Sequence, residues 1–331
     1  MVEIGANWLE NAKPLSFVFY LVPGFSLVAL SCAVDALRAA NVELGREQFS
    51  WHVSGSDPND ELASKVTSSS RLSMDIVPTS ALPDCDVIAV CGGERSHLFH
   101  CQRSETWLRQ QARSGKVVGS ISDAAYVLAG IGLFDNCRST IHWKCQLAYR
   151  ERYPKLDVRP TMLEIDGNRF SCAGGTASLD LMLKFIVRAA GDQVAGKIAD
   201  NYFHDVIRGD GDDQVQHMTS VFRFAGREKL LSDALELMET HLEEPLSIAE
   251  IATRLETTPR QLDRLFGRHL AASPSAFYRD LRLTRASGLL KQSMLSVSEI
   301  AVGCGFHSAS HLSRYFQKKY GETPLRHRRA S

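Results

Sequence analysis

The sequence predicts an α/β domain followed by an all-helical domain, and three observations support this prediction. The first half alternates apolar, strand-like runs with amphipathic stretches, as where 15–22 precedes 27–40 and 86–93 precedes 104–115. Continuous apolar runs joined by helices are typical of a mainly parallel sheet covered on both faces. From residue 229 onward the pattern is helical. The third observation is an internal repeat within the last hundred residues.

Length and composition indicate a two-domain globular protein. The chain has 331 residues, of which 44% are hydrophobic and 23% charged. Its N-terminus carries Glu3 and Glu10 without a long apolar run, so we expect no signal peptide. The apolar stretch 17–30 is too short, and too broken by Pro23 and Gly24, to span a bilayer. Eight scattered cysteines without a CxxC pair favour the reducing cytoplasm.

The charge is distributed unevenly although it sums to zero. Residues 246–331 hold 14 Lys+Arg against 6 Asp+Glu, whereas residues 1–245 hold 24 against 32. A basic module on an acidic body indicates a polyanionic partner such as nucleic acid. The alternative is chance, added to a cluster of arginines near the end of the chain.

Further strand-like runs lie at 49–55, 71–77 and 116–122, and a long helix is predicted over 177–191. Two of the predicted strands end in glycine pairs, Gly92-Gly93 and Gly174-Gly175, where the backbone is free to approach a ligand.

A change in composition marks the boundary between the two predicted domains. Segment 209–214 is acidic, contains glycine and has no apolar anchor, which is typical of a flexible linker. We therefore predict an α/β domain over 10–208, a linker over 209–227 and a helical domain over 228–331.

The repeat relates 246–274 to 295–324. Ile251-Ala252 recurs as Ile300-Ala301 at an offset of 49, and a second set recurs at an offset of 50: Leu262, Arg264, Phe266 and Pro274 match Leu312, Arg314, Phe316 and Pro324. Each unit reads as a short helix, a turn and a second helix. This is the helix-turn-helix arrangement, whose second helix enters the DNA major groove.

The second helix of each unit has an outward polar face. The predicted DNA-binding residues are Arg260, Asp263, Arg264, Arg268, Ser310, His311, Ser313 and Arg314. Arg264 and Arg314 occupy equivalent positions, and arginine suits a guanine edge or a phosphate. The alternative is a helical bundle with a solvated basic face; two units in tandem on the basic module favour double-stranded DNA as the partner.

The tandem units, the helix RLTRASGLL (282–290) between them and the terminal GFHSASHLSRYFQKKYGETPLRHRR resemble the AraC/XylS-type DNA-binding domain. The resemblance implies two recognition helices that read successive major-groove segments. The positions that match its base-contacting places are Arg260, Asp263, Arg264, Ala309, Ser310, Ser313 and Arg314. Ala309 is too short for polar readout of a base.

The first two hundred residues resemble the class I glutamine amidotransferase-like superfamily of PfpI type, which implies a flavodoxin-like fold. The matching motifs are LVPGFSLVALSCAVDALRAAN, DVIAVCGG, VVGSISDAAYVLAGIGLFDN, STIHW and SCAGGTASLDLMLKFI. Joined to an AraC-type tail, the arrangement resembles bacterial regulators of glycine betaine, carnitine or arginine use. It implies an activator that responds to a small effector, forms a homodimer and meets RNA polymerase.

The resemblance also decides the expectation about catalysis. Enzymatic relatives carry a cysteine at the strand-to-helix turn and a glutamate from the first helix; these places correspond to Ser122 and Ala29 here. His142 remains, but no carboxylate in the motif orients it as a base. Cys91 and Cys172 are expected to be buried, inert thiols. We therefore predict no catalytic residues; the alternative is a PfpI-like amidase or hydrolase whose tail only tethers it to DNA.

A ligand pocket is predicted where the strands end. Its expected residues are Gly92, Gly93, Ser122, Asp123, His142 and Trp143. Backbone N–H groups after Ser122 would favour a carboxylate, and Trp143 and Tyr126 would offer aromatic faces to a cation, which together suit a zwitterion or amine. Core packing is the alternative for Trp143 and His142, and a pure dimerisation scaffold is the alternative for the domain. No metal-ligand set or phosphate-binding glycine loop is apparent, so no cofactor is expected.

Overall fold

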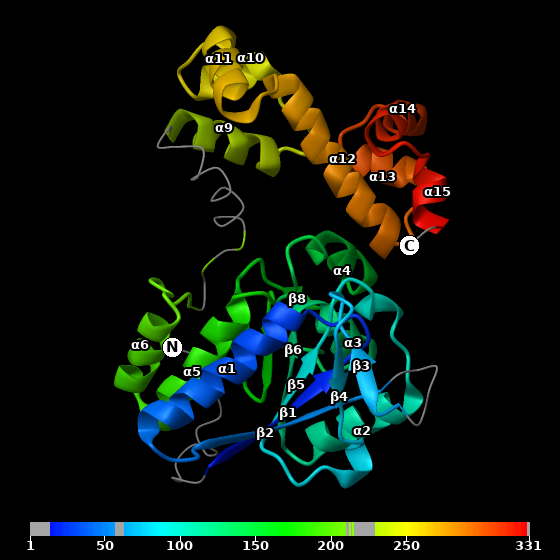
Figure 1. Ribbon diagram of the computed structural model, residues 1–331. Helices are drawn as coiled ribbons and strands as arrows, with labels where there is room; N and C mark the ends of the chain where they lie inside the picture. Colours follow the sequence, from blue (N-terminus) through cyan, green and yellow to red (C-terminus); the bar gives the residue numbers. More distant parts are fainter. Residues whose placement is uncertain (1–13, 57–62, 210–211, 213, 215–228, 330–331) are drawn as a thin grey trace. The chain divides into compact units, whose positions relative to one another are not determined.

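The structure is a computed structural model that describes residues 14–56, 63–209, 212, 214 and 229–329 (Figure 1). Contacts divide the chain into two units: residues 1–146 and 153–214 form an α/β unit, and residues 147–152 and 215–331 form a helical unit. Among the described helices, none is long and apolar enough to cross a membrane.

The α/β unit is built on a six-stranded sheet with the order β2-β1-β5-β6-β10-β9. Its strands are β1 (Leu15–Leu21), β2 (Phe49–Gly55), β5 (Val87–Cys91), β6 (Val117–Ile121), β9 (Leu163–Asp166) and β10 (Arg169–Cys172). All neighbours pair in parallel except β9, which is antiparallel to β10. The predicted mainly parallel sheet is confirmed.

Helices cover both faces of this sheet. Helices α1 (Leu27–Leu44), α5 (Ala177–Ala190) and α6 (Asp192–Asn201) pack together on one face, and α2 (Gln102–Arg113) and α3 (Ala125–Gly130) lie on the other (Figure 1). Further short strands of this unit are β3 (Lys65–Thr67), β4 (Ser73–Asp75), β7 (Arg138–Ser139) and β8 (Asp157–Val158). Helix α4 (Gln146–Arg152) is grouped, except for its first residue, with the helical unit.

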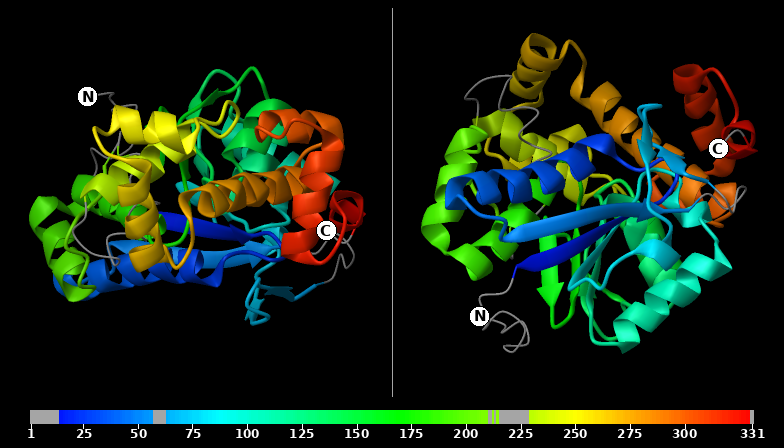
Figure 2. Two further views of the ribbon diagram at one scale, coloured as in Figure 1. Left: turned by 90° about the horizontal axis from the view of Figure 1, so that it is seen from above. Right: turned by 60° about the horizontal axis from the view of Figure 1, so that its bottom comes forward.

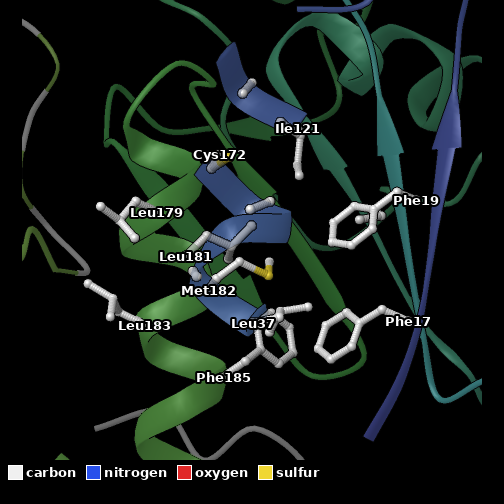
Figure 3. Packing of buried hydrophobic residues seen from close by; sticks show 14 of the residues in the cluster. Phe17, Phe19, Leu37, Ile121, Cys172, Leu179, Leu181, Met182, Leu183 and Phe185 are labelled. Carbon is white, nitrogen blue, oxygen red and sulfur yellow. The ribbon is translucent and has the colours of Figure 1, made fainter. Parts of the chain in front are cut away.

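Aromatic side chains fill the layer between the sheet and α1 and α5. Phe17 and Phe19 on β1 point toward these helices, and Leu37 and Phe185 meet them (Figure 3). The rings of Phe17 and Phe185 are 5.6 Å apart in an edge-on arrangement, which aromatic quadrupoles favour. All four side chains are buried. This packing makes the sheet a rigid base for the residues at its carboxyl edge.

The helical unit contains two helix-turn-helix pairs. Its helices are α9 (Lys229–Thr240), α10 (Ile248–Arg254), α11 (Pro259–Leu270), α12 (Pro274–Gln292), α13 (Val297–Gly303), α14 (Ala309–Tyr320) and α15 (Pro324–Arg329). The long helix α12 joins the pair α10–α11 to the pair α13–α14 (Figure 2). The predicted tandem arrangement is confirmed.

Capping residues explain where these helices begin. Pro259 opens α11 as its sequence predicts, and Ser308 caps α14 by accepting a hydrogen bond from the His311 N–H. The apolar positions Leu262 and Phe266 on α11 are fully buried, as are their repeats on α14. Each second helix therefore buries one face and leaves the opposite face to solvent.

Candidate functional site

Three adjacent strands bring Gly92, Ser122 and Gly174 to one edge of the sheet, whereas His142 and Trp143 lie in a loop after β7, outside this sheet. Gly92 follows β5, Ser122 follows β6 and Gly174 follows β10, and these strands are neighbours in the sheet. A Cβ on Gly92 would lie 2.5 Å from the Ala124 N, and one on Gly174 would lie 2.5 Å from the Ser122 Cβ. The glycines therefore serve close packing of the three turns against one another.

Ser122 keeps the backbone of a nucleophile elbow. Its φ is 60°, a left-handed value that costs a residue with a side chain about 1–2 kcal/mol. A 3₁₀ turn over Ser122–Ala124 leads from β6 into α3, and Ser122 is buried. The predicted strand, tight turn and helix start are confirmed in shape.

Asp123 is the most unusual group at this edge. Its side chain is 5% exposed, and its Oδ1 accepts no hydrogen bond from any described residue. Burial raises the pKa of this carboxyl from 3.8 to about 6, with a smaller contribution from Glu94, while a hydrogen bond with Cys145 opposes the shift. At neutral pH Asp123 is thus an ionised, incompletely satisfied acceptor, which is costly unless a donor meets it.

This carboxyl alters the expected polarity of the site. Helix α3 has only six residues, and Asp123 lies in the 3₁₀ turn that leads directly into it. The turn is consequently a poor place for the carboxylate of a ligand.

His142 is half-buried and neutral. Burial, together with a smaller effect of the Lys144 charge, lowers its pKa to about 4. The Lys144 N–H donates to the His142 Nδ1 at 3.4 Å, which leaves Nε2 as the protonated nitrogen. A histidine with this pKa is a weak general base at neutral pH, so it gives Ser122 little activation.

Trp143 and Tyr126 do not form a simple aromatic cage for a ligand cation. The Lys144 Nζ lies 5.4 Å from the centre of the Trp143 ring and therefore already supplies that ring with a cation. Tyr126 is buried, and its ring lies 5.7 Å from that of His97. Tyr126 belongs to the packed interior and not to a ligand-facing surface.

The thiols near this edge are buried. Burial raises the pKa of Cys172 to about 11 and raises that of Cys91 as well, which agrees with the predicted inert thiols. In the described part of the chain, no group of three His, Cys, Asp or Glu side chains is arranged to hold a metal ion.

Sequence reasoning missed Gln214, which lies in the predicted linker 209–227. Its side chain is buried, and its Nε2 donates to the Thr161 O at 2.7 Å, the Ile141 O at 2.9 Å and the Thr140 Oγ1 at 3.0 Å. Ile141 directly precedes His142. Gln214 is thus bonded to the loop after β7 that leads to a predicted ligand residue, and it belongs to the α/β unit; the linker itself stays a prediction.

A buried acid anchors the preceding segment. Asp180 on α5 accepts hydrogen bonds from the His204 Nε2 at 2.7 Å and from the Arg208 N and Nε at 2.8 Å each. The Arg208 Nη2 also donates to the Thr176 Oγ1 at 2.8 Å. No local sequence signal could have revealed this cluster, because its members are distant along the chain.

The predicted DNA-binding residues lie on the two second helices. Side chains that are exposed there are Arg260, Asp263, Arg264, Arg268, Ser310 and Arg314. His311 and Ser313 are half-buried, and His311 packs against Tyr315 with the ring centres 5.1 Å apart. Six of the eight residues thus present side chains to solvent on a basic surface, whereas His311 belongs partly to the packing beneath it.

Together, the fold and these surfaces define a DNA-binding protein that carries an amidotransferase-like α/β domain. Comparison with known proteins agrees with both parts. Residues 16–188 match the DJ-1/PfpI family, and residues 251–330 match a helix-turn-helix domain.

Full-length relatives make the assignment more specific. The HTH-type transcriptional regulator CdhR of Pseudomonas aeruginosa is 38% identical over 94% of this chain and 91% of its own length. The regulator GbdR of the same species is 35% identical over 95% of this chain and 84% of its own. A crystal structure of an AraC family transcriptional regulator from Pseudomonas putida has a TM-score of 0.52 and 26% identity, over 57% of this chain and all of that one. The chain belongs to the AraC-type transcriptional regulators with a DJ-1/PfpI domain.

Proposed function

We propose that this regulator activates a catabolic operon in response to a small amine, betaine or amino acid. The α/β unit binds the effector at the carboxyl edge of its sheet, and the helical unit binds double-stranded DNA. One observation carries the effector site: the buried, ionised and incompletely satisfied carboxylate of Asp123, set among the strand-end glycines. Homodimerisation, contact with RNA polymerase and a cytoplasmic location complete the proposal.

The chemistry of Asp123 narrows the class of effector. A carboxylate oxygen without a donor is satisfied by an N–H group, and most strongly by a charged one. Primary, secondary and tertiary ammonium groups and guanidinium carry such a hydrogen, whereas a quaternary ammonium does not. Lys144 lies near this carboxyl and can pair with the opposite, anionic end of the molecule. The site therefore favours zwitterions that keep at least one N–H.

A methylation series tests this directly. Glycine, N-methylglycine, N,N-dimethylglycine and glycine betaine share one carboxylate and one positive charge but lose one N–H at each step. The melting temperature of the full chain should rise with each of the first three compounds, because a ligand that binds only the native state stabilises it by mass action. Glycine betaine should give the smallest rise. A larger rise with glycine betaine would contradict the role of Asp123, and no rise with any zwitterion or amine would favour the scaffold alternative.

Asp123→Asn is the matched variant, and its stability has a predictable sign. The folded pKa of about 6 exceeds the ordinary value of 3.8, so the ionised carboxyl destabilises the fold by up to about 3 kcal/mol above pH 6. The variant should unfold at higher temperature than the parent at pH 8, with the difference fading as the pH falls below about 4. It should also lose the ligand-dependent rise; an unchanged rise in the folded variant would exclude Asp123 from the site.

The alternative of an amidase or hydrolase has less support. Ser122 stands where the cysteine of enzymatic relatives is expected, Ala29 is a buried alanine where their glutamate is expected, and His142 is a weak base. Ser122→Ala should change ligand affinity without abolishing any turnover. Hydrolysis of an amide or ester by the parent chain that disappears in Ser122→Ala would establish the enzyme instead.

A further inference from the structure

A cluster of cationic side chains surrounds the N-terminal half of α14. Arg279 on α12 lies with its Cζ 4.6 Å from the centre of the Tyr315 ring, and the Cζ of Arg314 lies 5.0 Å from the same centre. The neighbouring Arg282 on α12 lies over Phe306 at 4.8 Å. We refer to Arg279, Arg314 and Tyr315 as the α12–α14 clamp. Two guanidinium groups from different helices thus share one aromatic ring.

Electrostatic effects on His311 show how positive this surface is. His311 packs against the Tyr315 ring and stacks on His307, with the ring centres 5.1 Å and 5.7 Å apart. Desolvation lowers its pKa, and the charges of Arg314, His307, Arg282 and Arg279 each lower it further. Every charge that contributes to this shift is thus cationic, from both α14 and α12. Such an arrangement raises the affinity of the surface for an anion.

The clamp also holds its two arginines in place. Stacking of a guanidinium on an aromatic face restricts its orientation while its N–H groups stay available to a second partner. Arg314 is exposed and Arg279 is half-buried. A pre-oriented pair of guanidinium groups matches a phosphate, whose several oxygens accept hydrogen bonds from more than one arginine.

We propose that Arg279 and Arg314 bind one DNA phosphate together across Tyr315, so that the connecting helix α12 contacts the DNA backbone in addition to the two second helices. The sequence comparison of the two repeats did not indicate Arg279, because α12 lies outside both helix-turn-helix pairs. A phosphate contact fixes the register of a protein on the duplex without reading sequence. This inference rests on DNA binding by the helical unit.

The test measures binding of the full chain to a duplex of arbitrary sequence over a range of salt concentrations. Each phosphate contact contributes about 0.9 to the slope of log K against log salt. At 0.1 M salt, one such contact therefore raises the affinity about 8-fold relative to 1 M salt. We expect Arg279→Gln to weaken binding about 3- to 8-fold at 0.1 M salt. Lys291→Gln, which removes an exposed charge from the same helix outside the clamp, should change binding less than about 2-fold.

The double variant Arg279→Gln/Arg314→Gln distinguishes one shared phosphate from two. A shared phosphate predicts a total loss of about 0.9 from the salt slope, and two separate phosphates predict about 1.8, which would overturn the sharing. If Arg279→Gln weakens DNA binding no more than Lys291→Gln does, α12 does not contact the DNA. Thermal melts of each variant establish that it is folded, and Arg279→Lys should restore part of the affinity by restoring charge. Failure of the parent chain to bind any duplex would instead contradict the DNA-binding function itself.

Discussion

The two helix-turn-helix pairs share a backbone geometry that their sequences achieve with different residues. In the pair α13–α14, glycine occupies both left-handed positions, Gly305 with φ 68° and Gly321 with φ 75°. In the pair α10–α11 the equivalent positions, at offsets of 49 and 50, are Glu256 with φ 51° and Ala271 with φ 50°. A side chain in this conformation costs about 1–2 kcal/mol. The repeat thus preserves the turn, while the first pair carries strain that the second avoids.

The caps of the helices show a second difference. Helices α10 and α13 begin with equivalent capping boxes, Ser247 with Glu250 and Ser296 with Glu299. Helix α11 has a further box, formed by Thr258 with Gln261. The corresponding place on α14 is His311, whose N–H bonds to its cap while its ring joins the cationic cluster. The second pair therefore exchanges a capping side chain for one on the proposed DNA surface.

The largest expected difference between the pairs concerns Gly305. A Cβ there would lie 2.7 Å from both the Leu242 O and the Pro245 Cδ, in addition to the strain of its φ. Gly305→Ala should lower the free energy of unfolding of the helical unit by about 3 kcal/mol or more in urea titrations. Gly321→Ala is the control, because nothing lies within 4 Å of its added Cβ, and it should cost only about 1 kcal/mol. Equal decreases in the free energy of unfolding of the two variants would show that close contact with 242–245 does not contribute to the effect.

Arg264 and Arg314 occupy equivalent positions, but their substitution should affect DNA binding in different ways. Arg264 is exposed on α11, and Arg314 is engaged with Tyr315. Arg264→Ala should cost about 1–3 kcal/mol of binding to the operator and relax its sequence preference. Arg314→Ala should weaken operator and non-operator duplexes alike, since a phosphate contact carries no sequence information. Unchanged operator affinity in Arg264→Ala would remove it from base recognition.

Loss of a cap should affect the two pairs equally. Ser247→Ala and Ser296→Ala each remove the acceptor for an N–H in the first turn of a seven-residue helix. Each should lower the free energy of unfolding by about 1 kcal/mol. A twofold or greater difference between them, measured in the same urea titrations, would show that the pairs differ in stability for reasons beyond their turns.

The smallest effect should be a stabilisation confined to the first pair. Glu256→Gly relieves the left-handed strain but makes the unfolded chain more flexible, so the net gain should be about 0.5 kcal/mol. Ala271→Gly should act in the same direction. A loss of stability in both variants would mean that these side chains make contacts worth more than the strain.

The parts of the molecule that could be predicted from sequence are those with local periodicity. The strand at 49–55 and the helix start at 177 agree with the structure to the residue, because alternation and helical spacing of apolar residues repeat over many positions. The helix-turn-helix pairs were recognisable because two copies share offsets of 49 and 50. Left-handed Glu256 gave no such signal, since glycine is the residue that marks this conformation.

The candidate site was predictable in position but not in electrostatics. Strand ends and glycine pairs placed Gly92 and Ser122 at one sheet edge. The buried state of Asp123 depends on neighbours from distant segments, among them Glu94 and Cys145, so its raised pKa could not be read from its local sequence. The acidic, glycine-containing surroundings of Gln214 lack apolar residues and so predict a linker, whereas its bonds to 140–141 and 161 depend on the three-dimensional structure.

Those bonds decide where the sensor can be cut for separate study. A fragment ending at Arg208 would remove the amide that donates to the Ile141 and Thr161 carbonyls. The Thr161 O would keep its bond from the Thr140 Oγ1 at 2.7 Å, and the Ile141 O would keep a longer one from the Gln146 Nε2 at 3.4 Å. A fragment ending just after Gln214 retains the bonds from its amide. Truncation at the earlier boundary is therefore expected to loosen the loop 140–142 that leads to His142, and ligand screens on such a fragment would underestimate affinity for reasons unrelated to the effector.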